Sequence, residues 1–186
     1  MTHTDPDWSS IFSATLSRLP RDCRIEPKSG ELSRFPDMLN RLSESCPLPP
    51  YLPDLARLEL ALSSLEKGPQ EACPRPAVNP TLRHLELGWS GLAACLKPHP
   101  KEDIPPSREP ETLLLYQDPA SGEPRAHPAL PEDLLALKIV SDDLDPIQVA
   151  REQSRSASWL TSLLDRAREL GLILWPESGI RREPEI

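Results

Sequence analysis

The chain has 186 residues, of which 21 are basic and 29 acidic, so its formal net charge is -8. Hydrophobic residues make up 38% and aromatic residues 4%, which is enough apolar material for one core or two small ones and excludes a large enzyme domain. The 24 prolines follow no period and glycine is scarce, with 7 residues, which excludes collagen and simple glycine-rich disorder.

Proline clusters divide the chain, because proline can neither continue a helix nor donate to a central strand. We expect a helical N-terminal part (1–67), a connector with a short strand and a short helix (68–110), a winged-helix-like module (111–175) and a loosely held tail (176–186). The predicted fold class is therefore α+β, mostly α, with N-terminal helices followed by a small sheet and a winged helix–turn–helix.

The N-terminal part is predicted to hold three helices. The first runs from Asp5, a good N-cap, to about Leu19, and the second covers about Phe35 to Leu42. The third opens at Pro53 and ends at Gly68.

Asp54, Arg57 and Glu59 place dense charge on the third helix, beside a strong leucine stripe. A solvated face is the default interpretation of such charge. A partner-facing patch is the alternative.

The remaining elements are predicted from hydrophobic periodicity and turn residues. The connector should hold a short strand within Asn79–Leu87 and a short helix within Trp89–Leu96. The module should begin with a strand (Glu111–Gln117), a tight turn (Asp118–Glu123) and an edge strand (Pro124–Pro128). Two helices should follow, opening at Pro131 and Pro146. A last helix, which carries Trp159 and ends at Gly171, should lead to a terminal strand (Leu172–Trp175).

A helix–turn–helix suggests DNA binding, and Arg151, Arg155 and Arg166 are the candidate contacts. DNA-binding sites usually carry a basic stripe that neutralises phosphates. From Leu144 to Trp175 the chain has four basic and four acidic residues, so this segment has no net positive charge and no basic stripe. The charge pattern therefore argues against nucleic acid as the partner.

The sequence offers no catalytic constellation and no cofactor site. The four histidines are scattered, and the four cysteines (Cys23, Cys46, Cys73, Cys95) form no CxxC pair and have no histidine at metal-ligand spacing. We expect reduced, mostly buried thiols and neither a metal nor another cofactor. The acidic N-terminus lacks the features of a signal peptide, and no apolar run approaches a membrane span, so we expect a cytoplasmic protein with no membrane partner.

The run PYLPDLARLE, from Pro50 to Glu59, resembles the hallmark of HvfC-like proteins, often described as putative DNA-binding domain proteins. The usual tryptophan after the glutamate is replaced by Leu60. Two further segments, Phe35–Leu39 and Asn79–Arg83, are similar to family segments, and the match covers about residues 33 to 175.

The resemblance implies a non-catalytic partner in the maturation of a ribosomally made, modified peptide, which accompanies an iron-dependent or radical-SAM modifying enzyme. Its C-terminal module is similar to the PqqD-like domain that captures a leader peptide, and a DNA-binding winged-helix regulator is the alternative. The partner-binding residues would be Tyr51, Asp54, Arg57 and Glu59.

Leader peptide would add to a strand edge by main-chain hydrogen bonds. Thr112, Leu113, Leu114, Leu115 and Tyr116 would offer that edge, or else the returning strand Arg125–His127. The equally weighted alternative is that Leu113 and Leu115 are core, and that Thr112 and Leu114 merely cover it.

Overall fold

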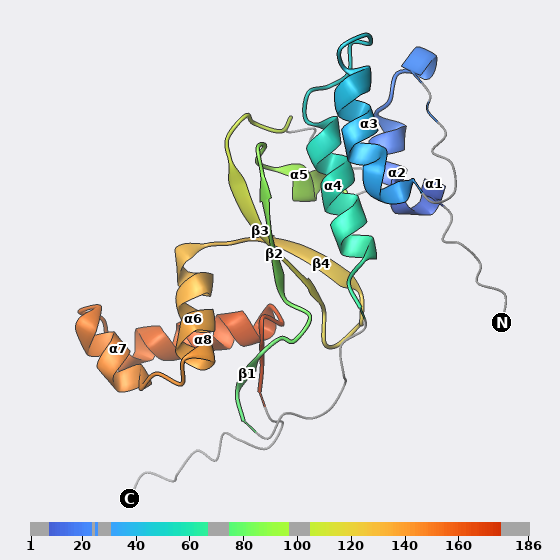
Figure 1. Ribbon diagram of the computed structural model, residues 1–186. Helices are drawn as coiled ribbons and strands as arrows, with labels where there is room; N and C mark the ends of the chain where they lie inside the picture. Colours follow the sequence, from blue (N-terminus) through green and yellow to red (C-terminus); the bar gives the residue numbers. More distant parts are fainter. Residues whose placement is uncertain (1–7, 24, 26–30, 67–74, 97–104, 176–186) are drawn as a thin grey trace, which may run out of the picture. The chain divides into compact units, whose positions relative to one another are not determined.

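The computed structural model describes residues 8–23, 25, 31–66, 75–96 and 105–175, which combine helices with small antiparallel sheets in an α+β, mostly helical fold, as predicted (Figure 1). The chain divides into two compact units. The first comprises Met1–Leu65, His84–Leu113 and Ala126–Pro128, and the second comprises Glu66–Arg83, Leu114–Arg125 and Ala129–Ile186. Residues of the predicted connector thus contribute to both units, whereas the predicted tail lies outside the described residues.

The first unit contains the helices of the N-terminal part and one short helix from the predicted connector. They are α1 (Trp8–Ile11), α2 (Ser13–Ser17), the 3-10 turns η1 (Arg21–Cys23) and η2 (Leu32–Arg34), α3 (Phe35–Leu42), α4 (Leu52–Ser63) and α5 (Leu92–Cys95). The prediction for α3 is confirmed at both ends.

The predicted first helix is wrong as one continuous element. It is two helices that meet at Phe12, whose φ of -103° and ψ of 33° are not helical. Phe12 is fully buried, and its backbone turns so that α2 begins anew at Ser13. The predicted cap at Asp5 lies outside the described residues.

Helix α4 ends at Ser63, earlier than predicted. The hydroxyls of Ser63 and Ser64 donate to the carbonyls of Leu60 and Ala61. Such side-chain bonds to the preceding turn compete with helical pairing, so the serines help to end the helix before Gly68, which lies outside the described residues. Helix α5 is likewise shorter than predicted and starts after Gly91, which has a φ of 80°.

One buried cluster of the first unit comprises Phe12, Phe35, Leu39 and Ala56, with the rings of Phe12 and Phe35 4.5 Å apart. Further fully buried side chains of the unit are Leu52, Leu55, Leu58, Leu92 and Leu113. Helix α4 packs against α1, α2, α3 and α5, so this one helix brings the other helices of the unit together.

The expectation of four reduced thiols is wrong for two of the cysteines, because Cys23 and Cys46 form a disulfide. The bond joins η1 to the segment that follows α3, two regions that only the folded chain brings together. Cys95 is a buried free cysteine, as predicted, and Cys73 lies outside the described residues.

The second unit holds three helices and a two-stranded sheet. These elements are β1 (Ala77–Val78), α6 (Pro131–Ser141), α7 (Pro146–Glu152), α8 (Ala157–Glu169) and β5 (Ile173–Leu174). Asp145 caps α7 by accepting from the Ile147 N–H at 3.0 Å, as its position before Pro146 predicted. Strand β5 pairs antiparallel with β1, so the terminal strand joins a strand from the predicted connector and not the hairpin.

A three-stranded sheet has the order β2–β3–β4. Its strands are β2 (Arg83–Leu87), β3 (Glu111–Gln117) and β4 (Pro124–Pro128), and the last two are confirmed at the predicted bounds. Strand β2 runs against β3, because Ser90 bridges Ser107 near one end while Thr81 accepts from the Gln117 N–H at the other.

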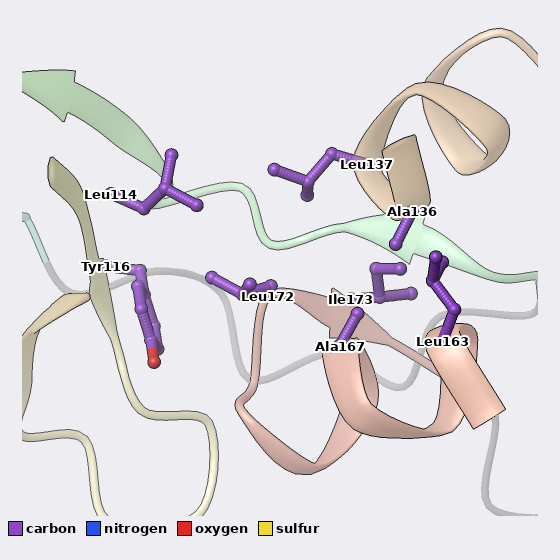
Figure 2. Close-up of a cluster of buried hydrophobic side chains, with 8 residues drawn as sticks. All are labelled: Leu114, Tyr116, Ala136, Leu137, Leu163, Ala167, Leu172 and Ile173. Carbon is purple, nitrogen blue, oxygen red and sulfur yellow. The ribbon is translucent and has the colours of Figure 1, made fainter. Parts of the chain in front are cut away.

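The core of the second unit gathers side chains from β3, α6, α8 and the β5 region (Figure 2). They are Leu114, Tyr116, Ala136, Leu137, Leu163, Ala167, Leu172 and Ile173. Beside this core the buried side chain of Asn79 donates to the carbonyls of Gln117 at 2.9 Å and Gly171 at 2.8 Å. One amide therefore connects β1, β3 and the end of α8.

Gly171 and Gly122 offer a matched test of this packing, because both have a positive φ, 78° and 71°. A Cβ on Gly171 would lie 2.6 Å from Pro119 Cδ, whereas one on Gly122 meets nothing within 4 Å. We expect Gly122→Ala to lower the free energy of unfolding by about 1 kcal/mol, the cost of a left-handed conformation. Gly171→Ala should lower it by about 3 kcal/mol, since overpacking adds to that cost. Urea unfolding measures both, and equal losses would contradict the packing.

Candidate functional site

The polar residues of the Pro50–Glu59 motif lie at the start and middle of α4 and contact two other segments, residues 88–89 and α2. The Tyr51 ring meets the Trp89 ring edge to face, with centroids 6.1 Å apart. The Asp54 carboxylate accepts from the Gly88 N–H at 2.7 Å and pairs with Arg57 at 3.1 Å. These contacts attach the first turn of α4 to the chain that follows β2.

Glu59 is neither on a solvated face nor available to a partner, because it is only 5% exposed. Its carboxylate accepts from the N–H groups of Ala14 at 2.7 Å and Thr15 at 3.0 Å. These are N–H groups of the first turn of α2, which lack a helical partner and receive no side-chain cap from Phe12. Glu59 therefore caps α2 from a different helix.

Burial raises the pKa of the Glu59 carboxyl above its ordinary value of 4.5, and interactions with Thr15, Ala14 and Arg18 offset part of the rise. The positively polarised end of α2 favours the charged form, but it does not outweigh the loss of water. The charge expected at the surface is thus held inside the unit.

Arg57 differs from the other three predicted partner-binding residues, because its side chain is 47% exposed. Tyr51 and Asp54 are half-buried and Glu59 is buried. The motif therefore presents one long cationic side chain to solvent, while its other polar groups hold α4 in place.

The predicted peptide-binding strand, β3, has no free edge. Strands β2 and β4 lie on either side of it, so its main-chain groups are already used in pairing. Leu113, Leu114, Leu115 and Tyr116 are all buried, and only Thr112 is exposed. The expectation that β3 offers an edge is corrected, as is the view that Leu114 only covers a core to which it belongs.

Strand β4, the other predicted edge, carries prolines on its outer side. The Asp118 N–H donates to the Glu123 carbonyl at 2.9 Å, and Gly122, with its positive φ, forms a bulge beside it. Main-chain N–H and C=O groups point alternately to the two sides of a strand. Those of Arg125 and His127 therefore point toward β3, while the main chain of Pro124, Ala126 and Pro128 points outward. Two of these three lack an N–H, so the outer edge of β4 offers a single donor.

Strand β2 ends the sheet on the opposite side and contains no proline. Arg83, His84 and Glu86 are exposed on it. Among the described residues no strand pairs with its outer edge, where an edge strand has alternating N–H and C=O groups. The sequence reasoning missed this edge, although the absence of proline from residues 83–87 was the signal that could have found it.

The three arginines proposed for DNA do not form a common surface of free cations. Arg166 pairs with the buried Asp133 at 3.4 Å, and Arg155 lies over the Trp159 ring at 5.5 Å from its centroid. Arg151 is exposed on α7. Two of the three thus already have intramolecular contacts.

Within the part of the chain that the structure describes, no group of three or more His, Cys, Asp or Glu side chains could hold a metal ion. Over the same ranges no helix is both long and apolar enough to cross a bilayer. His84 lies on β2 and His127 on β4, while His3 and His99 fall outside the described residues.

No protein-family model matches the chain, and a comparison with curated proteins finds no match.

The raised pKa of Glu59 predicts a pH-dependent difference between the wild type and Glu59→Gln. The unfolded chain loses the Glu59 proton near pH 4.5, before the folded chain does. The free energy of unfolding of the wild type should therefore fall relative to Glu59→Gln as the pH rises from about 4.5 through the folded-state pKa. The difference amounts to about 1.4 kcal/mol for each unit of pKa rise.

Urea unfolding between pH 4 and pH 8 measures this difference. Glu44→Gln, at an exposed position beyond α3, is the matched control and should follow the wild type at every pH. A constant gap between Glu59→Gln and the wild type would show that the Glu59 pKa is not raised.

Proposed function

We propose that this chain is a non-catalytic accessory protein that binds the leader of a ribosomally made precursor peptide and delivers it to a modifying enzyme in the cytoplasm. The observation that carries the proposal is the contrast between the two sheet edges. One edge, β4, is blocked by outward prolines, and the other, β2, is free of them. The resemblance of the Pro50–Glu59 motif supports the same role.

Leader peptide would bind as a further strand beside β2. An extended peptide gains its affinity from main-chain hydrogen bonds, and alternate side chains give specificity. The exposed Arg83, His84 and Glu86 would supply contacts to those side chains. The proposed peptide site thus lies one strand away from the one expected from sequence.

The modifying enzyme, iron-dependent or radical-SAM, would contact the exposed side of α4 through Arg57. This residue is the most exposed of the motif's four proposed partner residues, while Asp54 orients it through their 3.1 Å ion pair. Tyr51, Asp54 and Glu59 would act indirectly, by fixing the helix that carries Arg57.

Hydrogen–deuterium exchange of the full chain tests the peptide site, with the synthetic leader of the precursor encoded beside its gene as the ligand. At saturation we expect the amides of residues 83–87 to exchange at least about tenfold more slowly, because new main-chain bonds protect them. The amides of β4 should not change.

Ala126→Pro is the matched variant, because it removes the remaining outward N–H of β4 and spares β2. Its affinity for the leader should stay within about twofold of the wild type. Protection of residues 124–128, or a loss of binding in Ala126→Pro, would place the peptide on β4. Binding to duplex DNA that weakens steeply with salt, with no binding of the leader, would favour the regulator instead.

A further inference from the structure

The Cys23–Cys46 disulfide joins two short turns of the chain, each of which is closed by a backbone hydrogen bond. The Cys23 N–H donates to the Pro20 carbonyl at 3.0 Å, and the Cys46 N–H donates to the Leu42 carbonyl at 2.9 Å. The two Cα atoms are 6.7 Å apart. These backbone bonds fix each cysteine within its own turn and do not involve sulfur, so they do not depend on the bond between the two sulfurs.

The disulfide lies beside one buried cluster of the first unit. Ile25 and Leu48, each two residues beyond a cysteine, pack against the cluster that contains Phe12 and Phe35. The chain leading to Cys23 carries α1 and α2, and the chain leading to Cys46 carries α3. The bond therefore ties α1 and α2 to α3 across a sequence separation of 23.

We propose that Cys23 and Cys46 form a reversible thiol switch that sets how firmly α1 and α2 are held on the first unit. The inference rests on the cytoplasmic location in the proposed function, because disulfides in that compartment are mostly transient and redox-sensing. In an oxidising compartment the same bond would be a permanent cross-link.

The half-buried Cys46 is the point of attack, since Cys23 is only 6% exposed. The thiolate of a small thiol such as glutathione bonds to the Cys46 sulfur, and the bond between the two cysteines breaks as Cys23 leaves as a thiolate and takes up a proton. A second small thiolate then attacks the mixed disulfide and releases Cys46. The protein gains two electrons and two protons, and the two small thiols become one disulfide, which is the oxidant for the reverse reaction.

Reduction removes the covalent tie but leaves the cap that Glu59 gives to α2. The first two helices therefore stay folded on average but open more often. The change in opening is large, because a covalent loop of this length restricts the open chain strongly.

Titration of the full wild-type chain in glutathione buffers tests the switch, with alkylation and intact mass to count thiols. We expect a reversible two-thiol step within the range of glutathione ratios found in cytosol. Amides of α1 and α2 should exchange roughly a hundredfold faster in the reduced chain, as the lost loop constraint predicts. Cys46→Ser should exchange fast in every buffer, and Cys73→Ser, which keeps the pair, should behave as the wild type.

A bond that persists in every glutathione buffer would overturn the switch in favour of a permanent cross-link. Four thiols in every buffer, which would mean that Cys23 and Cys46 are never bonded, or equal exchange in the two forms, would also overturn it. The wild-type titration decides the matter even if Cys46→Ser fails to fold. Leader binding is measured separately, so failure of the proposed function leaves the thiol result readable, and the reverse also holds.

Discussion

The structure depends on one strand that is buried on both faces and paired at both edges. Four consecutive residues of β3, Leu113 to Tyr116, are buried, and alternation places Leu113 and Leu115 on one face with Leu114 and Tyr116 on the other. Residues up to Leu113 belong to the first unit and those from Leu114 to the second. A strand so enclosed has no edge left for a further strand, so the proposed peptide site must lie on a strand beside it.

Polar side chains inside the units act mainly by satisfying backbone groups of distant segments. Glu59 accepts from α2, Asp54 accepts from Gly88, and Asn79 donates to two carbonyls. Glu59 and Asn79 are buried and replace water for buried backbone groups. The bond between Asp54 and Gly88 lies at an exposed position. A motif whose charged residues suggest a binding surface can thus be mostly internal, with Arg57 as its outward part.

Local signals predicted the elements whose causes are local. The bounds of α3, β3 and β4 follow from proline positions, hydrophobic runs and the Asp118–Gly122 turn. The break at Phe12 could not be predicted, because the carboxylate that caps α2 comes from 45 residues away. The same reason hid the Cys23–Cys46 bond and the pairing of β5 with β1, which only the folded chain brings together. At the candidate site, sequence placed Arg57 at the surface correctly, whereas the choice of sheet edge needed the strand order.

The two edges of the sheet show how the prolines of this chain bear on function. An unpaired edge invites pairing with any extended chain, so proteins usually block it. On β4 the blocking prolines face outward, so they remove donors there without weakening the pairing with β3. Had both edges needed protection, β2 would be expected to carry a comparable block, yet residues 83–87 contain no proline. The proposed peptide-binding role fits this contrast, since an edge without proline beside one that prolines block would direct an extended ligand to a single place.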